Sequence, residues 1–168
     1  MDEKKKLREC PGCGLRMPLS DKVAYDGYFY CSPECWVIFE EILAGASGDP
    51  DYYPVRQLMV DAYAVQHAGG KHPNQSVILH LAGLYAAVDL QMPPDDVLPM
   101  LKRLNARVTR WPRLARPALP APLTVLEIAV AEGAEEGVNR TTTWASAVWN
   151  SWSEHHEFVA RLVREYGS

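Results

Sequence analysis

Hydrophobic residues beyond position 50 recur with the spacing of α-helices. Residues 52–67 and 74–89 each place one apolar stripe on a helix, and glycines or prolines follow both segments. A third, shorter helix is expected after Asp95 and Asp96, because acidic residues suit the positive end of a helix dipole. The three stripes are Val55, Met59, Ala62 and Gln66; Val77, Leu81, Leu84 and Val88; and Val97, Met100, Leu101 and Leu104.

The last third of the chain predicts a loop and two further helices. Residues 111–122 hold four prolines and are expected to be extended or looped. Thr124 and Glu127 have the spacing of a capping box, which predicts a helix ending near Gly133, with a strand as the alternative. Residues 144–166 carry one continuous stripe and predict a single helix of more than about twenty residues. That stripe consists of Trp144, Val148, Trp152, His155, Val159, Leu162 and Tyr166.

The first fifty residues have a different character. All four cysteines lie in residues 10–35, and the Gly- and Ala-rich stretch 44–50 follows, which predicts a flexible connection. We therefore expect a small zinc module in residues 1–46 and a helical domain in residues 51–168. The expected fold class is mainly α with a small α+β module: an N-terminal treble-clef zinc finger followed by an irregular helical bundle.

Two close cysteine pairs predict a metal site. Cys10 and Cys13 form a C-x2-C turn, and seventeen residues separate this pair from Cys31 and Cys35. Four thiolates satisfy the tetrahedral preference of zinc and leave no open position, so one structural Zn²⁺ is expected. A disulfide, a redox-active C-x2-C pair and an iron-sulfur cluster are the alternatives.

The residues around the second pair predict its local structure. Ser32 is a typical N-cap and Pro33 a typical first helical residue, which places Cys35 in the first turn of a helix. Asp26-Gly27, between two short aromatic segments, predicts a β-hairpin over residues 23–30 that delivers Cys31 to the ion.

Composition favours reduced thiols. The 168 residues are 48% hydrophobic and 23% charged with a net charge of -4, which is typical of a soluble globular protein and argues against a surface wholly devoted to nucleic acid. No apolar run suits a membrane span, and a charged segment follows Met1 in place of a signal peptide. A cytoplasmic location without membrane contact is expected, where disulfides are rare.

Histidines in the helical part suggest a second site. Three predicted helices carry them, and facing helices of a bundle can assemble a metal site with an open position for water. Such a site would hold a second divalent metal, although a histidine on an apolar face is more often a hydrogen-bonded core residue. The candidate ligands and supporting carboxylates are His67, His80, His155, His156, Asp61 and Glu154.

A basic strip is the third candidate. Residues 102–116 contain six Lys or Arg residues, no acidic residue and one tryptophan, Trp111. Such a strip could contact phosphate and stack a base, but a solvated helix face followed by a loop is the favoured interpretation. The candidate phosphate contacts are Arg103, Arg107, Arg110 and Arg113.

The sequence resembles known proteins in two respects. C-P-G-C-G followed by Y-D-G-Y-F-Y-C-S-P-E-C-W resembles the treble-clef modules of the YHS and TRASH kind over residues 8–43. That resemblance implies that Cys13, Cys31 and Cys35 bind metal, with Cys10 as an added ligand. The segments D-Y-Y-P-V-R-Q-L, H-P-N-Q-S-V-I-L-H-L and W-A-S-A-V-W-N-S-W-S-E-H-H resemble a bacterial family of uncharacterised proteins. This second resemblance implies the two-part architecture and no activity.

Three functions follow from these patterns. The preferred one is a zinc-binding protein whose helical domain binds a small ligand or a protein partner. A metal-dependent enzyme of hydrolase type is the first alternative, with the histidines as ligands. A nucleic-acid binder using residues 102–116 is the second. The patterns identify neither the partner nor the oligomeric state.

Overall fold

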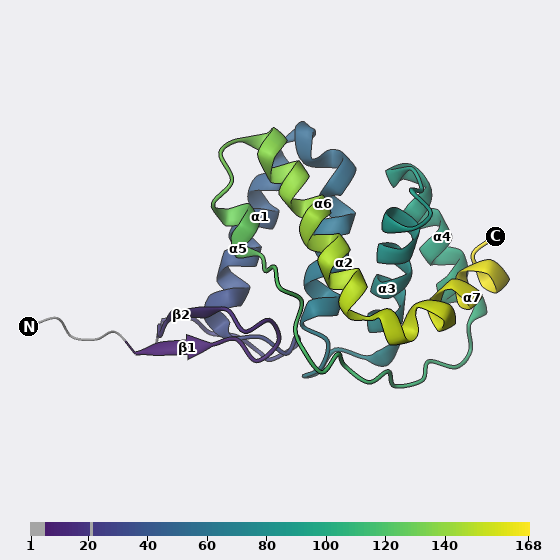
Figure 1. Cartoon of the computed structure of the whole chain (residues 1–168), viewed down its shortest axis with the longest axis horizontal. Coiled ribbons are helices and arrows are strands. Elements are labelled where there is room, and N and C mark those ends of the chain that lie inside the picture. Colours follow the sequence, from purple (N-terminus) through teal and green to yellow (C-terminus); the bar gives the residue numbers. More distant parts are fainter. Residues whose placement is uncertain (1–5, 21) are drawn as a thin grey trace, which may run out of the picture.

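A short β-ribbon precedes a bundle of helices (Figure 1). The computed structural model describes residues 6–20 and 22–168. Strands β1 (Leu7–Glu9) and β2 (Arg16–Pro18) pair antiparallel, with Arg8 opposite Met17. Glu34 attaches the ribbon to the first helix: its carboxylate accepts the Ser20 N–H at 2.9 Å and lies 3.3 Å from the Arg8 guanidinium. The chain is thus mainly helical with a small two-stranded sheet, as predicted at that level.

Helix α1 (Pro33–Gly48) begins where the sequence predicts. The Ser32 hydroxyl accepts the Cys35 N–H at 3.2 Å, which caps the helix and fixes Cys35 in its first turn. The predicted flexible connection at 44–50 is wrong for residues 44–48, because α1 continues through Gly48. Ala46 is buried there, so packing retains the helix despite the glycines.

The next three helices confirm the periodicity. After a 3₁₀ turn, η1 (Pro50–Val55), come α2 (Arg56–Gln66), α3 (Asn74–Val88) and α4 (Pro94–Arg107). The predicted stripes are buried except for Val88, which is half-buried. Helix α2 lies at the centre of the bundle, in contact with α1, α3 and α6. Whatever fixes the end of α2 therefore affects most of the core.

The C-terminal third departs from two predictions. Helix α5 (Leu126–Ala129) is a single turn, and Gly133, with φ at +91°, lies at the start of α6 (Ala134–Ser151) and not at the end of α5. The predicted long last helix is broken after Ser151 by η2 (Ser153–His155), and α7 (His156–Tyr166) follows. The break lets α7 pack against α3 and α4 while the apolar stripe continues, which periodicity alone cannot distinguish from one helix.

A long segment without helix or strand, residues 108–125, runs back along the bundle from α4 to α5 (Figure 1), as the prolines predict. Gln66 attaches it to the core: its amide donates to the Leu123 carbonyl at 2.7 Å and accepts the Trp144 indole N–H at 3.0 Å. The hydrophobic core is continuous from the cysteines to α7. Among the described residues, no helix has the length and hydrophobicity needed to cross a membrane.

The predicted hairpin at 23–30 is wrong, because residues 22–30 contain no strand. This segment instead pairs with the turn between α2 and α3. The Tyr30 N–H donates to the His67 carbonyl at 2.9 Å, and the Lys71 N–H donates to the Gly27 carbonyl at 3.2 Å. Backbone groups that a hairpin would pair locally are thus satisfied by a distant part of the chain.

Candidate metal centre

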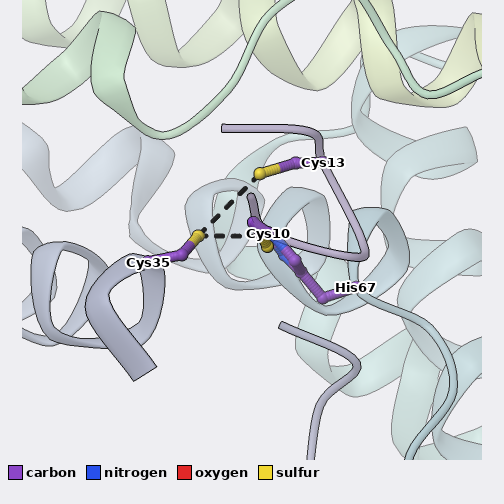
Figure 2. Close-up of side chains that lie close together, drawn as sticks. All are labelled: Cys10, Cys13, Cys35 and His67. Atoms are coloured by element: carbon purple, nitrogen blue, oxygen red, sulfur yellow. Dashed lines mark hydrogen bonds between the residues drawn. The ribbon is translucent and has the colours of Figure 1, made fainter. Parts of the chain in front are cut away.

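Three cysteines and one histidine converge in the interior, at the junction of the ribbon and the bundle. Figure 2 shows the side chains of Cys10, Cys13, Cys35 and His67 directed toward one another. Their ligand atoms all lie within 4.8 Å of each other, and all four residues are buried. Sulfur and imidazole nitrogen at this spacing form a candidate site for one metal ion.

The turn between β1 and β2 supplies the first two sulfurs. The Cys10 N–H donates to the Leu15 carbonyl and the Gly14 N–H to the Cys10 carbonyl, each at 2.8 Å, so the C-x2-C turn is tight. Gly14 has φ at +77°, a conformation that favours glycine. Gly12 allows a close approach: a Cβ there would lie 2.5 Å from His67 Cδ2 and closer still to the Tyr30 carbonyl oxygen.

Helix α1 supplies the third sulfur. Cys35 is fully buried in its first turn, where the N-terminal end of the helix favours negative charge. Donors also surround the sulfurs: the Tyr63 hydroxyl lies 3.6 Å from Cys35 Sγ, and the Ser32 N–H lies 3.4 Å from Cys10 Sγ. Burial raises the pKa of Tyr63, so its hydroxyl remains a neutral donor. These donors would partly offset the negative charge of bound thiolates.

His67, the C-cap of α2, supplies the nitrogen. Its Nδ1–H donates to the Tyr63 carbonyl at 2.8 Å, one turn earlier. That hydrogen bond selects the tautomer whose Nε2 carries a free lone pair, and Nε2 faces the cysteines, 3.5 Å from Cys35 Sγ. Tyr63 thus orients His67 through its backbone and contacts Cys35 through its side chain.

The spacing fits a tetrahedral zinc ion. With bonds of about 2.3 Å to sulfur and about 2.0 Å to nitrogen, tetrahedral ligands lie about 3.8 Å apart for two sulfurs and about 3.5 Å apart for sulfur and nitrogen. The sulfurs of Cys13 and Cys35 are 3.9 Å apart, and Cys35 Sγ is 3.5 Å from His67 Nε2. The described cysteines are free thiols rather than disulfides. The residues therefore fit zinc in both ligand type and distance.

The electrostatics of the cluster favour a cation. Hydrogen bonds to Cys10 and Cys13 raise the pKa of Cys35, whereas hydrogen bonds from Cys13 and Cys35 lower the pKa of Cys10. Without a cation, several adjacent buried thiolates would repel each other, which disfavours ionisation of all three sulfurs together. A divalent ion would remove this repulsion and let all three bind as thiolates.

Cys31 differs from the prediction. The sequence predicts a fourth thiolate from Cys31, but the cluster contains His67 in its place. Cys31 is itself buried, and this burial raises the pKa of its thiol. It precedes the N-cap of α1, so the path of the loop before the helix decides where its sulfur points. The sequence also predicts His67 as a ligand, but of the second metal site in the helical part.

The other candidate ligands do not gather with His67. His80 lies on α3, and its Nδ1–H donates to Asp61 at 2.7 Å, a carboxylate that also accepts from the Gln57 amide at 2.7 Å. Burial raises the pKa of Asp61. Glu154 is exposed, and His155 Nε2 lies 2.8 Å from the Ala115 carbonyl. Within residues 6–20 and 22–168, the predicted second metal site is not assembled.

His156 is a packing residue. Its ring stacks on Trp149 with centroids 3.8 Å apart, and its Nε2–H donates to the Trp149 carbonyl at 2.9 Å. We expect H156A to lower the free energy of unfolding by about 1–2 kcal/mol, the sum of one aromatic contact and one hydrogen bond. Urea denaturation measures this loss, and metal analysis of the same sample should show no change. A loss of metal in H156A would instead show that His156 is a metal ligand.

The arginines of the basic strip have separate surroundings. Arg103 Nε–H donates to the Gly167 carbonyl at 2.8 Å, and Arg107 donates to the Ser168 carbonyl at 2.7 Å, so both hold the end of α7. Arg110 is exposed, whereas Arg113 lines a cleft together with Arg116. Arg103 and Arg107 thus make packing contacts, and of the four only Arg113 lines the cleft. The four predicted phosphate contacts therefore do not form one binding surface.

Comparisons with known proteins give one match. A family model described as "Family of unknown function (DUF5946)" matches residues 8–153, which include the four residues of the cluster. Neither the search of curated proteins nor the search of solved structures found a match.

Proposed function

The chain belongs to the family of unknown function DUF5946, and on this premise we propose that it is a zinc-binding protein whose single ion is structural. One observation supports this proposal above the others: four buried Cys and His ligand atoms lie within 4.8 Å of one another and come from three separate parts of the fold. An ion there would join the β-ribbon, the start of α1 and the end of α2.

The ligand set favours zinc over other groups. Three thiolates and one imidazole form a common structural zinc site, and zinc accepts both ligand types at tetrahedral angles. Iron-sulfur clusters are held mainly by four cysteines. The four residues that converge here include only three cysteines, and the fourth is a histidine. A redox-active C-x2-C pair would need an accessible sulfur, whereas Cys10 and Cys13 are both buried.

The coordination number supports a structural rather than a catalytic ion. Catalytic zinc keeps a position open for water or substrate, and four protein ligands leave none. The turn with Cys10 and Cys13 and the helix that bears Cys35 are two elements of a treble clef. The arrangement differs from the predicted module in two respects. Residues 23–30 form no hairpin, and the proposed fourth ligand, His67, comes from the end of α2. Because zinc thiolates need reduced cysteines, we place the protein in the cytoplasm.

Metal analysis of two variants tests the proposal. Full-length wild-type protein should contain one zinc ion per chain, whereas H67A should retain little zinc and bind it at least about tenfold more weakly, because a direct ligand is lost. The matched control is C31A, which removes a buried cysteine outside the cluster. It should retain the metal content of the wild type.

Absorption spectra after cobalt substitution give the ligand count independently of folding yield. Three thiolates and one nitrogen are expected in the wild type and in C31A. A four-thiolate spectrum, or loss of metal from C31A but not from H67A, would show that Cys31 and not His67 is the fourth ligand. Wild-type protein without metal would overturn the proposal.

A further inference from the structure

A cleft of about 530 Å³ opens beside the metal centre. The turn between α2 and α3, the first turns of α3, residues 112–116 and Trp152 line it. We call it the arginine cleft, after Arg113 and Arg116. Its volume lies in the range of small-molecule sites. We propose that the arginine cleft binds a small phosphomonoester that carries an apolar or aromatic group.

Positive charge at the cleft is not balanced locally. Arg113 and Arg116 line it, and none of the Asp and Glu residues that the structure describes is among its lining residues. Arg113 is exposed and has no hydrogen bond or ion pair to any residue of 6–20 or 22–168. The cleft therefore attracts anions although the whole chain has a net charge of -4.

Arg116 is already held in position. Its guanidinium stacks over the Tyr30 ring, 4.5 Å from the centroid, and its Nη2–H donates to the Pro11 carbonyl at 3.5 Å. Both partners adjoin the metal centre, because Pro11 lies between Cys10 and Cys13 and the Tyr30 N–H donates to the His67 carbonyl. They line a neighbouring cavity, which shares Arg116 with the arginine cleft. A preformed guanidinium loses less conformational entropy on binding an anion.

Other polar groups of the cleft lining favour a phosphate. Asn74 lines the cleft at the first turn of α3, a helix of 15 residues that has no side-chain cap. His72 also lines the cleft and is only 6% exposed, and its Nδ1 has no hydrogen-bond partner among the described residues. Two guanidinium groups and the N–H groups of a helix end offer more donors than one carboxylate can accept. The three terminal oxygens of a phosphomonoester suit them better.

The remaining wall is apolar. Val77, Ile78, Leu114 and the nearly buried Trp152 form it. A ligand that places its phosphate at the arginines would rest its other end against this wall, which favours an apolar or aromatic group over a bare anion. The Gly69-Gly70 turn fixes one side, because a Cβ at Gly70 would lie 2.6 Å from the Gly27 carbonyl oxygen.

Calorimetric titration of the metal-loaded full chain with phenyl phosphate tests the proposal. We expect binding to the wild type, weaker binding of inorganic phosphate and benzoate, and none of phenol. R113A and R116A should weaken the binding of phenyl phosphate by about tenfold or more, since each variant loses a charge-assisted contact. R110A is the matched control, because Arg110 is an exposed arginine that does not line the cleft. It should bind like the wild type.

Other outcomes overturn the proposal. No binding of phenyl phosphate by the wild type, or equal binding by wild type and R113A, would exclude a phosphomonoester site in this cleft. Binding of a single-stranded oligonucleotide but not of phenyl phosphate, weakened equally in R110A and R113A, would indicate a nucleic-acid surface instead. Because zinc is measured in the same samples, failure here is separate from failure of the metal proposal: each variant should retain its ion.

Discussion

Removal of the proposed zinc ion by a chelator is expected to unfold the helical bundle together with the N-terminal segment. His67 is the C-cap of α2, which contacts α1, α3 and α6, and the hydrophobic core continues from the cysteines into the bundle. Structural zinc contributes about 10–16 kcal/mol in zinc-finger peptides, which is as large as the whole stability of a typical domain, about 5–15 kcal/mol. The metal-free chain should therefore lose most of its cooperative structure.

Circular dichroism measures this coupling. Far-UV signal reports the helices. Near-UV signal reports the ordered aromatic side chains, which include Trp36, next to Cys35, and the fully buried Trp144 and Trp149 on α6, outside the metal centre. Both signals should fall together after chelation and return when zinc is added. A chelator presaturated with zinc serves as the control. If the tryptophan signal survives while only the N-terminal segment changes, residues 1–46 and 51–168 fold as the separate units that the composition suggests.

Gly12→Ala is expected to disable the metal centre without removing a ligand. The new Cβ would lie 2.5 Å from His67 Cδ2 and closer to the Tyr30 carbonyl, so the C-x2-C turn could not approach the end of α2. Overpacking of a buried site costs about 1–3 kcal/mol, and here it also displaces ligands. We expect a loss of about 3 kcal/mol in unfolding free energy and a large loss of zinc affinity.

Gly45→Ala is the matched control. Gly45 lies inside α1, and a Cβ there meets no atom within 4 Å. Alanine favours helix over glycine by about 1 kcal/mol, so G45A should be neutral or slightly stabilising, with unchanged zinc. Zinc competition with a chromogenic chelator and urea denaturation give the two readouts. Wild-type zinc affinity in G12A would show that the turn and His67 do not meet as described.

Local features of the structure were predictable from neighbouring residues. The Ser32 cap, the start of α1 at Pro33 and the three stripes of α2, α3 and α4 depend on contacts within a few residues. The same reasoning failed where a local pattern has two solutions. Asp26-Gly27 permits a hairpin, but its backbone groups pair instead with the turn after α2. The stripe through residues 144–166 continues across a break.

By itself, the amino-acid sequence determined a mainly helical chain with a cysteine turn suited to metal. Three of the four residues in the cluster, Cys10, Cys13 and Cys35, were already candidates on spacing alone. The tertiary structure decided that His67, rather than Cys31, lies with the other three cysteines in the cluster, and that Arg103 and Arg107 hold the C-terminus while Arg113 lines a cleft. The physical reason is that a spacing constrains only nearby atoms, whereas the meeting of α2 with the cysteine turn depends on how the helices pack.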